Sequence, residues 1–136
     1  MANEIKIAIR QTSAATSEAA IRQHKTLIDR PAAKGGDDQG PMGGELFLAA
    51  IGGCFMSNLL AAIKGREAAI SDAHTDVIGV LDGSPARFTA VELNVTAKYS
   101  DREQFEKLID IADRGCIMMN TLRGKLDIQV RIAALV

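Results

Sequence analysis

The stretch ELFLAAIGGCFMSNLLAAIK, residues 45–64, is the least polar part of the chain. Residues 46–63 carry no charge, and their only polar side chains are Ser57 and Asn58. This length reaches the lower limit for a helix that crosses a membrane. A single span without a basic flank pattern would leave a folded part on each side unexplained. We therefore expect a helix that is buried on all sides inside a folded protein.

Three small residues recur along this helix at intervals of four. Ala49, Gly53 and Ser57 fall on one helical face, where another helix can approach closely. In so short a chain, a strong candidate for that neighbour is the same helix of a second subunit.

Composition limits the classes of function. A chain of 136 residues with 47% hydrophobic residues predicts one folded domain, residues 1–136. The formal net charge of −1 argues against nucleic acid and against an anionic membrane as partners. Residues 1–10 lack the basic and apolar pattern of a secretory leader, so we expect a cytoplasmic protein. Stable structural disulfides are rare in that compartment.

Hydrophobic periodicity predicts an α+β fold. Alternating polar and apolar residues indicate strands at 4–10, 20–29, 76–81, 88–99 and 125–133. Helices are expected at 45–64 and at 101–114, the second with Ser100 as its N-cap. Residues 32–44 hold five glycines and predict a loop. The order β-β-α-β-β-α-β predicts a mostly antiparallel sheet packed on helices.

The two cysteines allow two interpretations. Cys54 and Cys116 could be small apolar core residues, since free cysteine is often buried. Alternatively, Cys54 is a nucleophile on the apolar helix, which would require a lowered pKa and hence a nearby cation. Cys116 directly follows Gly115, the expected end of the second helix, where a side chain is easier to reach. It could then condense with a sulfenic acid on Cys54.

Other chemistries find little support in the sequence. His24 and His74 join the two cysteines as possible zinc ligands, but no pair has the usual ligand spacing. The glycine-rich loop lacks the Lys-Ser/Thr pair of a phosphate-binding loop. We therefore expect neither a metal nor a cofactor.

Several segments together resemble the OsmC/Ohr family of organic hydroperoxide reductases. The segment ELFLAAIGGC, residues 45–54, resembles the family's cysteine-bearing helix, and ADRGCIMMNTLR, residues 112–123, resembles the segment around its second cysteine. HKTLIDRP at 24–31 and GGDDQGP at 35–41 complete the resemblance, which spans roughly residues 20–132.

The resemblance implies an intertwined homodimer, in which antiparallel sheets wrap around the paired cysteine-bearing helices. It also implies an antioxidant, stress-response activity. Cys54 would reduce an organic hydroperoxide to an alcohol, Cys116 would resolve the sulfenic acid, and a dithiol reductant, lipoyl-type or other, would reduce the disulfide.

The family also places an arginine beside the thiolate and a glutamate that orients it. Arg22 is our choice for the arginine, with Arg30 in reserve. The family's glutamate stands ten residues before the first cysteine, where this chain has Gly44; Glu45, one residue later, is the candidate in its place. Ile117 stands where a proline is usual. These departures keep an alternative open: a non-catalytic or redox-sensing relative that binds a small hydrophobic ligand at the dimer interface.

Overall fold

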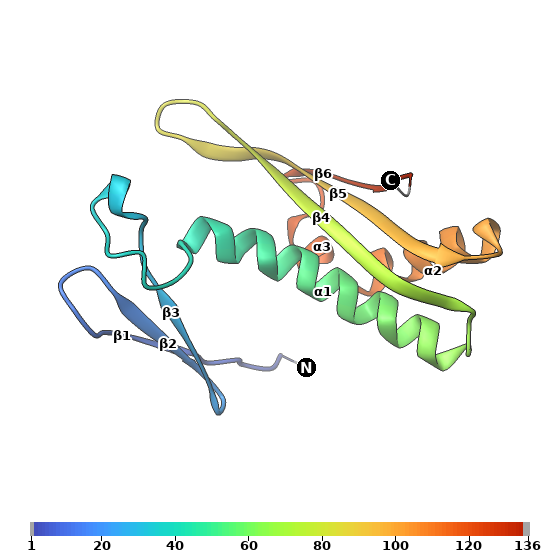
Figure 1. Cartoon of the computed structure of the whole chain (residues 1–136), viewed down its shortest axis with the longest axis horizontal. Coiled ribbons are helices and arrows are strands. Elements are labelled where there is room, and N and C mark those ends of the chain that lie inside the picture. Colours follow the sequence, from blue (N-terminus) through green and yellow to red (C-terminus); the bar gives the residue numbers. More distant parts are fainter. Residues whose placement is uncertain (1, 135–136) are drawn as a thin grey trace. The chain divides into compact units, whose positions relative to one another are not determined.

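The computed structural model describes residues 2–134, and the chain divides into two compact units, Met1–Phe47 and Leu48–Val136. Each unit is described by itself (Figure 1). The elements are β1 (Ala8–Gln11), β2 (Ser17–Ile21), β3 (His24–Ile28), the 3-10 helix η1 (Ala32–Lys34), α1 (Gly43–Gly65), β4 (Ile70–Asp82), β5 (Arg87–Tyr99), α2 (Arg102–Gly115), α3 (Ile117–Leu122) and β6 (Asp127–Ile132).

The N-terminal unit is built on an antiparallel sheet in the order β1-β2-β3. The single strand predicted at residues 20–29 is wrong, because the chain reverses at Arg22 and Gln23 between β2 and β3. Arg22 takes the left-handed backbone conformation with φ of 54°. Tight hairpin turns usually place glycine or asparagine there, so the sequence carries no ordinary turn signal.

The C-terminal unit holds a second sheet, in the order β4-β5-β6. The long strands β4 and β5 pair antiparallel, and β6 pairs parallel to β5 (Figure 1). Parallel neighbours need a crossover connection, which α2 and α3 supply. The α+β class and the dominance of antiparallel pairing are confirmed, with this one parallel pair added.

The core of this unit lies between one face of β5 and the helices. Val91, Leu93 and Val95 are buried, whereas the alternating Glu92 and Asn94 are half-buried. This is the two-sided pattern that the sequence predicts for the strand. The helices contribute the other large buried side chains: Ile51, Phe55, Leu59, Phe105 and Leu108.

Helix α1 lies close to β4 because glycines stand at the contacts. A Cβ on Gly52 would come within 2.5 Å of Val77 Cγ2, and one on Gly79 would come within 2.9 Å of Leu48 Cδ2. Side chains at these positions would push the helix away from the strand.

Within the single chain, α1 is not buried on all sides. Ile51 and Phe55 are buried, but Ala49, Gly53 and Ser57 are exposed. The predicted stripe of small residues is thus an open helix face. By length and hydropathy α1 could also cross a membrane, but one such helix is weak evidence, because core helices of soluble proteins have the same composition.

The segment around α2 differs from the prediction in two details. Its N-cap is Asp101 rather than Ser100, and the Asp101 carboxylate accepts from the Gln104 N–H at 3.1 Å. Helix α3 was not predicted. It has only six residues, too few for a helical period to show in the sequence.

Candidate active site

The structure brings the two cysteines together within the C-terminal unit. Cys54 is half-buried in the middle of α1. Cys116 is completely buried, and it ends α2 and begins α3. Both are free thiols, and they are joined by a hydrogen bond between their side chains. When two thiols are in hydrogen-bond contact, oxidation of either sulfur can lead to a disulfide between them.

The surroundings of Cys54 lower the pKa of its thiol below the ordinary value. Partial burial acts to raise the pKa of Cys54, but three hydrogen bonds to its sulfur outweigh that effect. The Cys116 thiol donates the first, and the backbone N–H groups of Met118 and Ile117 donate the others. Each donor stabilises the thiolate more than the thiol. None of the three is the cation that the sequence led us to expect.

Cys116 shows the opposite behaviour. Burial raises the pKa of its thiol, and donation of its proton to Cys54 raises it further. The pair is therefore asymmetric: the pKa of the half-buried Cys54 is lowered and that of the buried Cys116 is raised, so Cys54 loses its proton first as the pH rises. The thiolate is the nucleophilic form of cysteine, so Cys54 is the member of the pair suited to attack an electrophile.

Ile117 offers a direct test of the backbone donors. Proline suits the first position of a helix but has no N–H, so Ile117→Pro should keep α3 and remove one bond to Cys54. We expect the pKa of Cys54 to rise and alkylation by iodoacetamide at pH 7 to slow several-fold. The measurement is the alkylation rate of Cys54 against pH.

Ile117→Val is the matched control, since it trims the exposed side chain and keeps the N–H. Equal profiles for the proline and valine variants would mean that the Ile117 N–H does not stabilise the thiolate.

The charged residues predicted for catalysis belong to the N-terminal unit. Arg22 occupies the turn between β2 and β3 and is exposed. Glu45 lies in the first turn of α1, where its Oε1 accepts from the Met42 N–H at 2.8 Å. This is half of a capping box, which stabilises the start of a helix. Nothing in that bond tests a catalytic role, so the roles of Arg22 and Glu45 stay predictions.

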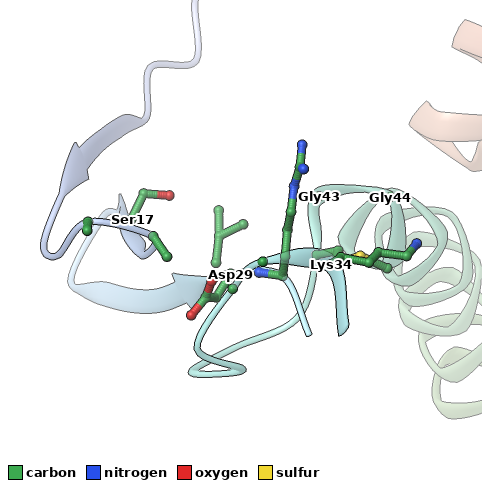
Figure 2. Close-up of a pocket in the computed structure, with 12 residues that line it drawn as sticks. Ser17, Asp29, Lys34, Gly43 and Gly44 are labelled. Atoms are coloured by element: carbon green, nitrogen blue, oxygen red, sulfur yellow. Dashed lines mark hydrogen bonds between the residues drawn. The ribbon is translucent and has the colours of Figure 1, made fainter. Parts of the chain in front are cut away.

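A groove of about 690 Å³ is formed entirely within the N-terminal unit (Figure 2). Its lining includes Ser17, Asp29, Lys34, Gly44 and the reserve candidate Arg30. It contains neither cysteine. Among residues 2–134 there is also no group of three side chains able to hold a metal ion. The groove and the cysteine pair therefore belong to different units of the chain.

Asp29 organises the loop that borders the groove, a role that the sequence analysis missed. It is 3% exposed, and its Oδ2 accepts from the Thr16 hydroxyl at 2.9 Å and from the Gln39 N–H at 3.1 Å. The N–H groups of Asp37 and Arg30 also donate to it. An aspartate directly after a strand and two residues before Pro31 is a turn signal that could have indicated this role.

Known proteins of one family are similar to this chain in sequence and in fold. The family model for OsmC-like protein matches residues 35–131. The chain therefore belongs to the OsmC-like family, which confirms the resemblance seen in the sequence. It has no match among curated protein sequences.

Solved structures show the same architecture over nearly the whole chain. An OsmC-like protein from Mycoplasma pneumoniae has a TM-score of 0.81 at 19% identity, covering 100% of both chains. A hypothetical protein from Aquifex aeolicus has a TM-score of 0.82 at 13% identity, covering 97% of this chain and 96% of the other. The organic hydroperoxide resistance protein OhrB of Bacillus subtilis has a TM-score of 0.70 at 26% identity, covering 96% and 98%.

Proposed function

We propose that this protein is a thiol-dependent peroxidase that reduces organic hydroperoxides to alcohols. The observation that carries the proposal is the hydrogen-bonded pair of Cys54 and Cys116, in which the pKa of the accessible thiol is lowered and that of the buried thiol is raised. Membership of the OsmC-like family and the similarity to an organic hydroperoxide resistance protein support it.

The reaction runs in three balanced steps. The Cys54 thiolate attacks the outer peroxide oxygen; an S–O bond forms, the O–O bond breaks, and the alkoxide takes a proton to leave as the alcohol. Cys54 is then a sulfenic acid. The sulfur of Cys116 attacks it, forming the disulfide and releasing water. An external dithiol reduces the disulfide by exchange and is itself oxidised.

The apolar surface next to Cys54 suits an organic rather than an inorganic peroxide. Ile117, whose N–H bonds to Cys54, has a side chain that is 70% exposed. A substrate with a hydrocarbon part could bury this side chain as it reaches the sulfur, which favours binding by the area removed from water.

A homodimer is part of the proposal. The open face of α1 carries Ala49, Gly53 and Ser57, which allow a second helix to approach closely. In the N-terminal unit Ile7, just before β1, and Ile9, within it, are exposed, and neighbouring exposed apolar side chains of this kind suit a contact with a second subunit. Sedimentation in solution should then give twice the 14.5 kDa of the chain, and a monomer would contradict it. No nucleic acid, membrane or cofactor takes part, and the cytoplasm is the proposed location.

Within this proposal Arg22 holds the thiolate and Glu45 orients Arg22. Glu45→Gln keeps an oxygen that can accept from Met42 and removes the charge. If Glu45 acts in catalysis, hydroperoxide turnover should fall about 10-fold or more while thermal stability stays near that of the wild type. Steady-state turnover and a melting curve measure the two effects.

Arg22→Lys is the companion variant, because lysine keeps a charge but loses the planar fork of donors that arginine offers to a carboxylate. Full turnover in both variants would remove the two residues from the catalytic site.

The experiment that tests the function is oxidation of the reduced protein with one equivalent of cumene hydroperoxide. The proposal expects an intramolecular Cys54–Cys116 disulfide by mass spectrometry and one equivalent of alcohol. Cysteines that stay reduced in folded protein would overturn it. That result would leave the ligand-binding alternative, which Gly44 in the place of the family's glutamate favours.

A further inference from the structure

The side chain of Asn58 links α1 to the end of α2. Its Nδ2 donates a hydrogen bond of 3.3 Å to the carbonyl oxygen of Ala112. Asn58 lies about one helical turn after Cys54, and Ala112 lies about one turn before Cys116. The two helices are thus joined at two successive levels: Asn58 to Ala112, and Cys54 to Cys116.

The Ala112 carbonyl lacks its usual helical partner. In a continuing α-helix it would accept from the N–H of Cys116, four residues later. That N–H donates instead to the Asp113 carbonyl at 3.2 Å, as α2 tightens at its end. Ala112 is completely buried, and a buried carbonyl left without a donor is costly. The amide of Asn58 supplies the donor.

An amide is an unusual side chain in this segment. Asn58 is half-buried on a helix whose 18 central residues carry only one other polar side chain. Burial of an amide is unfavourable unless it makes hydrogen bonds. The last residue of α2 also comes close, since a Cβ on Gly115 would lie 3.7 Å from Asn58 Nδ2. The amide is therefore directed at the end of α2.

We propose that Asn58 is a positioning residue, which fixes where α2 ends and so holds Cys116 and the N–H groups that follow it against Cys54. Only the resolution of a sulfenic acid by Cys116 rests on the proposed function. The placement of the two thiols in the reduced protein, and their oxidation by other reagents, do not depend on it. Reactions between held groups depend strongly on their placement, so looser placement should slow resolution.

Asn58→Leu tests this, because leucine has a similar volume and no donor. We expect the pH profile of Cys54 alkylation by iodoacetamide, followed by mass spectrometry, to move to higher pH. Formation of the Cys54–Cys116 disulfide with diamide should slow about fivefold. Asn58→Ala provides a second variant if the leucine protein does not fold, as judged by circular dichroism.

Thr75→Val is the matched control. The Thr75 hydroxyl donates to Met56 Sδ at 3.0 Å, a half-buried bond that holds α1 to β4 instead of α2. We expect its alkylation profile and disulfide rate to match the wild type. An unchanged profile in folded Asn58 variants, or an equal shift in Thr75→Val, would overturn the proposal.

The outcome is separate from that for the peroxidase, because neither reagent is a hydroperoxide. If cumene hydroperoxide fails to oxidise the pair while Asn58→Leu shifts the profile, the proposed function fails and the positioning role of Asn58 stands.

Discussion

Cys54→Ser is expected to reduce hydroperoxide turnover by about 10³-fold or more. A serine hydroxyl is not ionised near neutral pH, and the three donors around Cys54 cannot lower its pKa far enough to change that. Substitution of one atom in a half-buried side chain should leave the fold intact, which circular dichroism can check. The measurement is consumption of cumene hydroperoxide with a dithiol in excess.

Cys116→Ser separates attack from resolution. The serine hydroxyl can still donate to Cys54, so the first step should proceed and consume one equivalent of hydroperoxide per chain. The sulfenic acid should then accumulate and be trapped by dimedone. Appreciable turnover in Cys54→Ser, with loss only in Cys116→Ser, would reverse the assigned roles.

Asp29→Ala should have the largest effect on the N-terminal unit. The change removes the acceptor for the Thr16 hydroxyl and for the N–H groups of Arg30, Asp37 and Gln39. Asp29 and these donors hold the loop that includes Lys34. Trypsin cleaves this loop after Lys34, because it does not cleave after Arg30, which precedes Pro31. We expect cleavage after Lys34 to become about 10-fold faster. Limited proteolysis of the full chain measures it.

Asp37→Ala is the control for this loop. It removes a carboxylate from the same segment but keeps the N–H that bonds to Asp29. Its cleavage rate should match the wild type. A wild-type rate in Asp29→Ala would show that another contact holds the loop.

The Asp29 carboxylate also makes the stability of the fold depend on pH in the acid range. Burial acts to raise the pKa of Asp29, but the hydrogen bonds led by the Gln39 N–H outweigh it, so the pKa is lowered from 3.8. A carboxylate with a lowered folded-state pKa stabilises the fold above its unfolded value. The stabilisation is lost as the pH falls below about 4 and on through the lower folded value. At neutral pH Asp29 is ionised and contributes this stabilisation in the wild type. The difference in trypsin cleavage between Asp29→Ala and the wild type is therefore expected at neutral pH.

The sequence predicted the features that depend on neighbours along the chain. The alternation at Val91, Leu93 and Val95 predicted a strand with one buried face, and the uncharged run at 46–63 predicted α1. That run could not show which face of α1 stays open, because an apolar helix has no polar side to mark it.

The features that depend on contacts through space could not be predicted. The hydrogen bonds to Cys54 come from residues more than 60 positions away, and two of the three donors are backbone N–H groups that every residue except proline carries. Asn58 lies 54 residues from Ala112. The turn at Arg22 was missed because a residue with a Cβ occupies a backbone conformation that usually signals glycine.

The backbone origin of two donors to Cys54 affects how the site tolerates mutation. At Ile117 and Met118, the bond to Cys54 depends on the path of the chain rather than on the side chain. Random substitution there can vary the surface offered to a substrate while the thiolate keeps these donors. In the proposed peroxidase, substrate preference and the reactivity of the Cys54 sulfur can therefore evolve separately at these two adjacent positions, with proline as the exception.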